Sequence, residues 1–166
     1  MDRKRSCADP AGAALARQFR TVAAYYRGAE RELEKQGVWS YRMTASGAWA
    51  LSRPAHVFYF LRKTGIPKES LFIDLGSGNG IVACIAGLFA RSIGIESDPD
   101  LVASARTAAG RLGLDGRVSF IRADFFSQRI RRADYLYVYP DKPLYRLEEI
   151  LPAGVEHCWS MVLIFH

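Results

Sequence analysis

The chain has 166 residues, 49% of them hydrophobic and 24% charged, and its formal net charge at pH 7 is +6. This length and composition are typical of one globular domain with a real core, and they exclude a fibrous or disordered chain. No apolar run reaches the ~18 residues that a membrane span needs. No apolar segment of the kind found in secretory signals follows the basic residues 1–7.

The three cysteines, Cys7, Cys84 and Cys158, are odd in number and far apart. Such spacing predicts neither a disulfide framework nor a metal site. A reducing cytoplasmic location is therefore the expectation.

The first predicted element is an amphipathic helix of about 20 residues. Its apolar stripe recurs at steps of four and three: Leu15, Phe19, Val22, Tyr26, Ala29 and Leu33. We expect it to end near Gly37. Trp39, Tyr41 and Trp49 follow, and they either anchor this segment on the core or form a lid. We therefore divide the chain into an N-terminal helical extension and possible lid, residues 1–53, and a main domain, residues 54–166.

Positive charge is concentrated at the start of the chain. Residues 1–70 contain 13 Lys or Arg against 6 Asp or Glu, whereas residues 71–166 contain 10 against 11. A basic segment can attract an acidic partner such as RNA. A solvated helix face explains the same charges, so both interpretations stay open.

Strands and helices alternate through the remainder of the chain. Helices are predicted at Pro54–Gly65, Ile81–Ala90, Pro99–Leu112 and Leu144–Leu151, and strands at Leu71–Leu75, Ser92–Glu96, Val118–Arg122, Tyr135–Tyr139 and Met161–Phe165. This alternation predicts an α/β fold with a mostly parallel, doubly wound sheet and helices on both faces.

The most informative segment joins the first of these strands to its helix. Asp74 closes the strand, and Gly76, Gly78 and Gly80 follow at every second position. Glycines let a ligand approach the bare backbone and permit the positive φ that tight turns need. Glu96 closes the next strand, about 20 residues past the first glycine, which is the offset of an acid that binds ribose hydroxyls.

This D-x-G-x-G-x-G pattern resembles motif I of the class I, Rossmann-like methyltransferases that use S-adenosylmethionine. A dinucleotide-binding dehydrogenase would need a glycine or alanine where Ile81 stands, so that alternative is disfavoured. The resemblance covers roughly residues 54–165. It implies S-adenosylmethionine as cofactor and no metal.

The resemblance also implies a role for each matching residue. Asp74 and the loop of Gly76, Ser77, Gly78 and Gly80 would hold the methionyl part of the cofactor, and Glu96 the ribose. Asp124, just past the third strand, would contact the adenine amino group, and Phe125 would pack on the adenine ring.

The fourth strand leads into Tyr139, Pro140 and Asp141, which we take as candidate catalytic residues near the transferred methyl group. They do not match the [DNS]-P-P-[YFW] motif of enzymes that methylate base amines. A narrower resemblance, carried by Pro54, Phe125-Phe126 and Tyr139-Pro140, points to small protein-lysine methyltransferases. The predicted acceptor is therefore an amine such as a protein lysine. A non-catalytic binding module and an RNA methyltransferase are the alternatives.

Class I methyltransferases usually have a sixth and a seventh strand that form an edge hairpin. The sequence ends at His166, and no residues remain for that hairpin. An apolar edge strand promotes aggregation unless something covers it. We therefore expect the N-terminal helix, a second subunit in a homodimer, or a partner to cover this edge, or the chain to be shorter than a complete member of the family.

Overall fold

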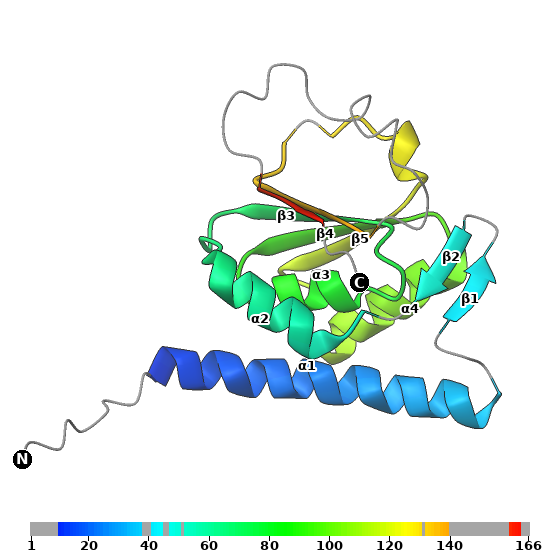
Figure 1. The fold of residues 1–166 in the computed structure, drawn as a ribbon, viewed down its shortest axis with the longest axis horizontal. Coiled ribbons are helices and arrows are strands. Elements are labelled where there is room, and N and C mark those ends of the chain that lie inside the picture. Colours follow the sequence, from blue (N-terminus) through cyan, green and yellow to red (C-terminus); the bar gives the residue numbers. More distant parts are fainter. Residues whose placement is uncertain are drawn as a thin grey trace, which may run out of the picture.

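The computed structural model describes residues 10–37, 41–44, 47–50, 52–130, 132–139 and 160–163. Its centre is a five-stranded sheet in the order β5-β4-β3-β6-β7, and every neighbouring pair is parallel (Figure 1). The strands are β3 (Leu71–Leu75), β4 (Arg91–Glu96), β5 (Val118–Arg122), β6 (Tyr135–Val138) and β7 (Ser160–Leu163). This is the order 3-2-1-4-5 of a doubly wound sheet.

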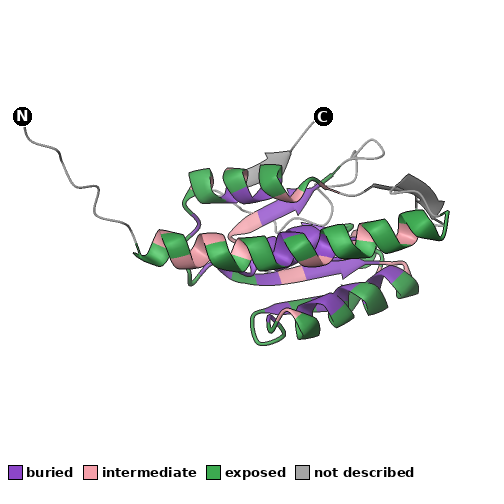
Figure 2. Ribbon diagram, turned by 90° about the horizontal axis from the view of Figure 1, so that it is seen from below, coloured by how far each residue is buried: buried purple, intermediate pink, exposed green. Residues whose placement is uncertain are grey.

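Four helices lie on one side of this sheet (Figure 1). They are α1 (Pro10–Lys35), α2 (Pro54–Thr64), α3 (Ile81–Ala86) and α4 (Pro99–Arg111). Figure 2 shows α1 running across the other helices, with much of its outward surface exposed. The short α3 is buried along its whole length, since α1 covers it from outside and the sheet from inside.

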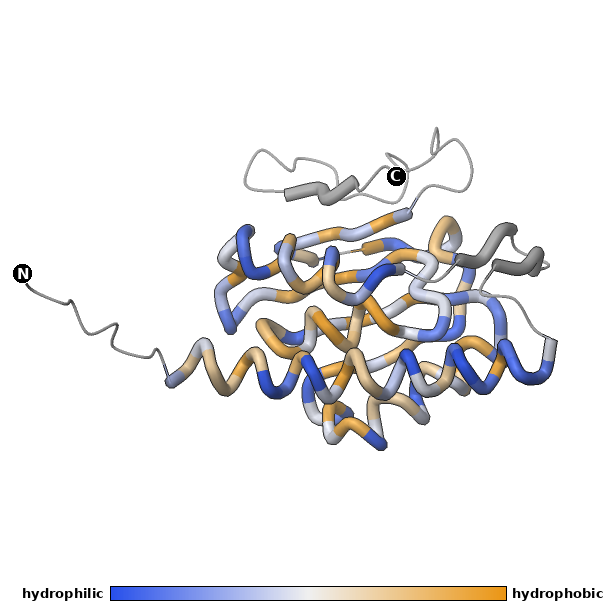
Figure 3. Tube along the Cα trace, turned by 60° about the horizontal axis from the view of Figure 1, so that its bottom comes forward, coloured by the Kyte–Doolittle hydropathy of each residue, from blue (hydrophilic) through white to orange (hydrophobic). Residues whose placement is uncertain are grey.

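Side chains alternate across β3 and β6, as the period of a strand requires. Phe72 and Tyr137 join the core cluster on the helical face, whereas Ile73 and Leu136 belong to a second cluster on the opposite face. Ile130 and Ala133 cover this second face, together with the 3₁₀ helix η1 (Phe125–Ser127). Apolar residues concentrate between these layers (Figure 3).

The α/β fold predicted from the sequence is therefore confirmed, including its parallel Rossmann-like sheet. The helix expected at residues 144–151 lies outside the described residues. Within the described part, η1 and the irregular segment after it cover the second face.

The predicted helix ends agree with the structure where a local signal exists. Pro54 stands in the first turn of α2, and Gly65 ends that helix with φ of 67°. Asp98 caps α4 by accepting hydrogen bonds from the main-chain N–H groups of Asp100 and Leu101.

One predicted boundary and one predicted length are wrong. The helix expected to reach Ala90 ends at Ala86, and the next residue is Gly87, whose missing side chain leaves room for Val118. A Cβ at Gly87 would lie 2.3 Å from Val118 Cγ2. The N-terminal helix has 26 residues and is longer than expected.

Two further features differ from expectation. Residues 38–53 include an antiparallel hairpin of β1 (Tyr41–Thr44) and β2 (Gly47–Ala50), which the sequence pattern did not predict. The long helix α1, one candidate to cover the β7 edge, packs mainly against α2 and α3 (Figure 1). Among the described helices, none has both the length and the apolar character needed to cross a bilayer.

Candidate functional site

The candidate site lies at the carboxyl-terminal edge of the parallel sheet. The chain leaves β3 for α3 and β4 on one side, while β6 pairs with β3 on the other side. The strand order therefore reverses between β3 and β6, and doubly wound folds bind their ligands at such a reversal. Asp74 sits here, paired in register with Gly94 of β4 and Tyr137 of β6.

The glycine loop after β3 is a compact, left-handed turn. Gly76, Gly78 and Gly80 have φ of 73°, 54° and 83°, which L side chains rarely adopt. The main-chain N–H groups of Gly76 and Ser77 both donate to the carbonyl oxygen of Ile95, at 2.9 and 3.0 Å. The end of β4 thus fixes the first half of the loop.

Gly80 has a packing role that the sequence analysis did not identify. A Cβ at this position would lie 2.5 Å from Phe120 Cζ and 2.8 Å from Ala105 Cβ. Gly94 is similar, because its Cβ would approach both Phe120 and Ser77 Oγ to 2.6 Å. A glycine inside a strand is the sequence signal for such a close approach. These two glycines let the loop sit tightly on the sheet.

The Glu96 carboxylate joins the glycine loop to the turn between β4 and α4. Its Oε2 accepts a hydrogen bond of 2.9 Å from the Gly78 N–H. Its Oε1 accepts from the N–H groups of Ser97 and Asp98, at 2.8 and 2.9 Å, and from the Ser97 hydroxyl at 3.3 Å. The side chain is only 8% exposed. A carboxylate has about four acceptor directions, two on each oxygen. Among the described residues only the Gly78 N–H donates to Oε2, so this oxygen can accept a second hydrogen bond from a ligand hydroxyl.

Asp74 is a buried carboxyl group that lacks part of its hydrogen bonding. The residue is 1% exposed, and within the described structure neither its Oδ2 nor the Ser77 Oγ has a hydrogen-bond partner. The pKa of Asp74 is raised to about 8, chiefly by burial; a hydrogen bond from the main-chain N–H of Ala83 opposes the shift, and the negative charge of Glu96 adds to it. Such a group is suited to accept a hydrogen bond or a nearby positive charge from a ligand.

Tyr137 forms the β6 side of the site. Its ring packs on Phe72, with 6.4 Å between centroids. Burial and the nearby Asp74 raise the pKa of Tyr137 to about 12, although a hydrogen bond with Ser52 lowers it. Strand periodicity puts Tyr135 and Tyr137 on the same face of β6, and both side chains belong to the helical-side cluster.

Phe125, expected at the adenine ring, lies beside the glycine loop. The Phe125 Cε1 atom is 3.9 Å from the position that a Cβ on Gly76 would take. Phe125 also packs on Phe126, with 4.4 Å between ring centroids. Asp124 is exposed, and its Oδ1 caps η1 by accepting from the Phe126 N–H at 2.9 Å.

The candidate catalytic residues are only partly described. Tyr139 follows β6 and is 44% exposed, at the same sheet edge as the glycine loop. Pro140 and Asp141 lie outside the described residues. The structure therefore brings together Asp74, the glycine loop, Glu96 and Phe125.

Comparisons with known proteins agree with this architecture. No protein-family model matches the chain, and no curated protein matches it. YjhP from Escherichia coli superposes with a TM-score of 0.54 and 22% identity, over 60% of this chain and 43% of that one. With the strand order, this likeness shows a doubly wound, Rossmann-like α/β fold.

Other solved structures resemble shorter parts of the fold. An RNA methyltransferase from Salinibacter ruber, in complex with S-adenosyl-L-homocysteine, has a TM-score of 0.48 and 34% identity over 54% of this chain. An S-adenosylmethionine-dependent methyltransferase from Geobacter sulfurreducens, with the same ligand, has a TM-score of 0.48 and 23% identity over 53%. The chain spans 60% and 36% of the lengths of these two proteins. None of the comparisons supports the narrower resemblance to protein-lysine methyltransferases.

Proposed function

We propose that the chain is an S-adenosylmethionine-dependent methyltransferase whose acceptor is an amine, such as the side chain of a protein lysine. The observation that supports this most strongly is the bond between the Glu96 carboxylate and the Gly78 N–H. It places an acid with a free acceptor direction directly against a glycine loop. A nucleoside with adjacent ribose hydroxyls fits that pairing.

The residues present fit such a cofactor on a second ground. Asp74 Oδ2 and Ser77 Oγ are buried polar atoms without partners in the described structure, and the ammonium group of a ligand could donate a hydrogen bond to such an oxygen. Glu96 would hold the ribose, Phe125 would pack on the adenine ring, and Asp124 would accept from its amino group. When bound, the cofactor supplies an electrophilic methyl group.

The protein's part in the reaction is chiefly alignment. The acceptor nitrogen must present a neutral lone pair in line with the bond that breaks, and such positioning contributes several kcal/mol, up to about 7–11 in favourable cases. Tyr139 stands at the sheet edge where this acceptor would enter, and we propose Tyr139, Pro140 and Asp141 as its contacts. A lysine ammonium would have to lose one proton to solvent before transfer, because only the neutral amine has a lone pair.

A non-catalytic binding module is the second candidate, because a fold does not by itself establish an activity. An RNA methyltransferase is the third, and the excess of Lys and Arg in residues 1–70 favours it. All three candidates use the same cofactor site. The two enzymes differ in their methyl acceptor, and the binding module has none.

Two measurements test the proposal in order. Isothermal calorimetry of the whole chain is expected to show binding of S-adenosylhomocysteine and none of NAD. Incubation with cell lysate and methyl-labelled S-adenosylmethionine is then expected to label protein. Binding without transfer would favour the binding module, and label in RNA would favour the RNA enzyme. No heat with S-adenosylhomocysteine, or tight binding of NAD, would overturn the cofactor assignment.

A further inference from the structure

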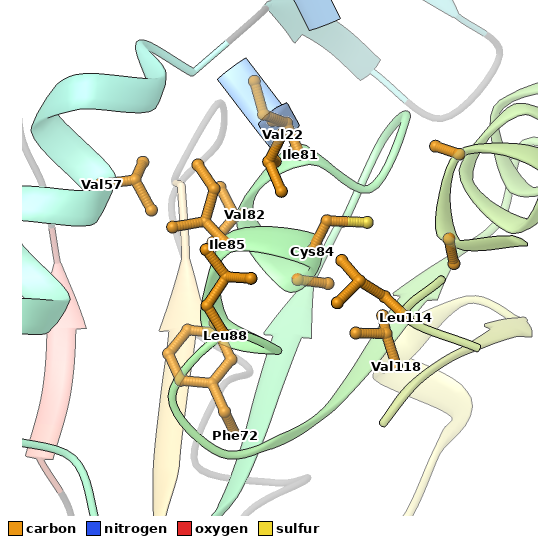
Figure 4. Close-up of a cluster of buried hydrophobic side chains, with 14 of the residues drawn as sticks. Val22, Val57, Phe72, Ile81, Val82, Cys84, Ile85, Leu88, Leu114 and Val118 are labelled. Carbon is orange, nitrogen blue, oxygen red and sulfur yellow. The ribbon is translucent and has the colours of Figure 1, made fainter. Parts of the chain in front are cut away.

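The N-terminal helix delivers one side chain to the glycine loop. Tyr26 is buried on the inner face of α1, next to the buried Val22. Figure 4 shows Val22 lying over Ile81 of α3. At the same interface Phe19 stacks on Phe58 of α2, with 4.0 Å between ring centroids. These contacts hold α1 against α2 and α3, and they fix the Tyr26 ring between them.

The Tyr26 hydroxyl stands between the glycine loop and α3. It lies 3.2 Å from the main-chain oxygen of Asn79 and 3.3 Å from the Sγ of Cys84. A phenol has one hydrogen to donate, and a carbonyl oxygen is a far better acceptor than a thiol sulfur. The arrangement that satisfies all three groups has the phenol donating to Asn79 and the Cys84 thiol donating to the phenol. Burial raises the pKa of Tyr26 far above its usual value, so the donor stays protonated.

The hydrogen bond between Tyr26 and the Asn79 carbonyl adds a third restraint on the glycine loop. Three residues of the loop are glycines at positive φ, and glycine loses more conformational freedom on ordering than any other residue. Ile95 holds the N–H groups at the start of the loop, and Glu96 holds that of Gly78. Both restraints come from β4. Tyr26 acts from the opposite side, on the residue that follows Gly78.

We propose that Tyr26 is a positioning residue of the cofactor site, holding the Asn79 carbonyl so that the glycine loop is ordered before a ligand binds. The helix α1 is then part of the site's framework as well as of the core. That the ordered loop receives S-adenosylmethionine rests on the proposed function. The restraint on the loop itself rests only on the contacts.

The decisive variant is Tyr26→Phe, which removes the hydroxyl and keeps the buried ring. Tyr25→Phe is the matched control, because Tyr25 is half-buried on the same helix and packs edge-on against Tyr26 at 5.3 Å. Amide hydrogen exchange of the free protein is read in a peptide covering residues 76–84, with residues 101–109 of α4 as an internal reference. Calorimetry with S-adenosylhomocysteine is the second readout.

Loss of one net hydrogen bond predicts that loop amides of Tyr26→Phe exchange about three- to tenfold faster, with an unchanged reference peptide. The dissociation constant for S-adenosylhomocysteine should rise by about the same factor. Tyr25→Phe should stay within about twofold of wild type in both readouts. Cys84→Ala, which keeps the Asn79 contact, should leave loop exchange near the wild-type rate.

Unchanged loop exchange in Tyr26→Phe would overturn the proposal, whatever happens to binding. So would an equal acceleration in the α4 reference peptide, since that indicates general destabilisation. A loop effect of the same size in Cys84→Ala would assign the contact to the thiol and overturn the role of Asn79. Wild-type protein that fails to bind S-adenosylhomocysteine would defeat the proposed function, while the exchange data would still decide the restraint.

Discussion

The main-chain N–H of Gly78 donates a hydrogen bond of 2.9 Å to Oε2 of Glu96. The two residues belong to different segments: Gly78 lies in the loop after β3, and Glu96 is the last residue of β4. The bond therefore couples loop shape to the acid that the sequence assigned to the ribose. A substitution of either residue should therefore change both the conformation of the loop and the affinity for the ligand.

Glu96→Gln should weaken S-adenosylhomocysteine binding by about ten- to a hundredfold, because hydrogen bonds to a charged group contribute roughly 1.5–3 kcal/mol. Calorimetry measures the effect. Glu69→Gln is the matched control, as Glu69 is exposed before β3, and it should bind as wild type does. Equal affinities for Glu96→Gln and wild type would show that Glu96 does not bind the ribose.

Gly78→Arg should abolish detectable binding of S-adenosylhomocysteine, because a long side chain would occupy the backbone surface that the ligand approaches. The positive φ of 54° adds strain, so thermal melting must first establish that the variant is folded. A folded variant with normal affinity would mean that the glycine loop is not the binding site.

The stability of the protein should fall as pH rises through the range set by Asp74. Its pKa is raised from 3.8 to about 8 on folding, so the folded state binds more protons than the unfolded state between these values. The free energy of unfolding then decreases with pH across this window, by at most about 1.4 kcal/mol per pH unit, and levels off above it.

Asp74→Asn should flatten this dependence, since the amide cannot ionise. Urea denaturation at pH 5, 6.5 and 8 gives the comparison, and the exposed Asp115→Asn serves as control and should keep the wild-type slope. The prediction fails if Asp74→Asn and wild type lose the same stability between pH 5 and 8.

Gly80→Ala should destabilise the fold by about 2–4 kcal/mol, because a methyl group would meet Phe120 and the residue has φ of 83°. Gly28→Ala should have the opposite sign. A Cβ there meets nothing within 4 Å, and alanine in a helix is favoured over glycine by about 0.8–1 kcal/mol. Chemical denaturation measures the free energy of unfolding of both variants. If both substitutions change it in the same direction by a similar amount, the prediction is wrong.

Local patterns in the chain were sufficient to predict much of the fold. Proline and glycine signals placed the ends of α2, and Asp98 the start of α4, because caps depend on a few neighbouring residues. Alternation of strands and helices was enough for the parallel sheet. Since the carboxyl ends of parallel strands meet at one edge, the proximity of Asp74 and Glu96 to the glycine loop also followed from the sequence.

Other features depend on contacts between residues that are distant along the chain, and a local pattern holds no information about them. The packing role of Gly80 depends on Phe120, forty positions later, and the close approach at Gly87 depends on Val118. The raised pKa of Asp74 comes from burial under several elements at once. The hydrogen bond from Tyr26 to Asn79 spans 53 positions, and only the docking of α1 on α2 and α3 brings the two residues together.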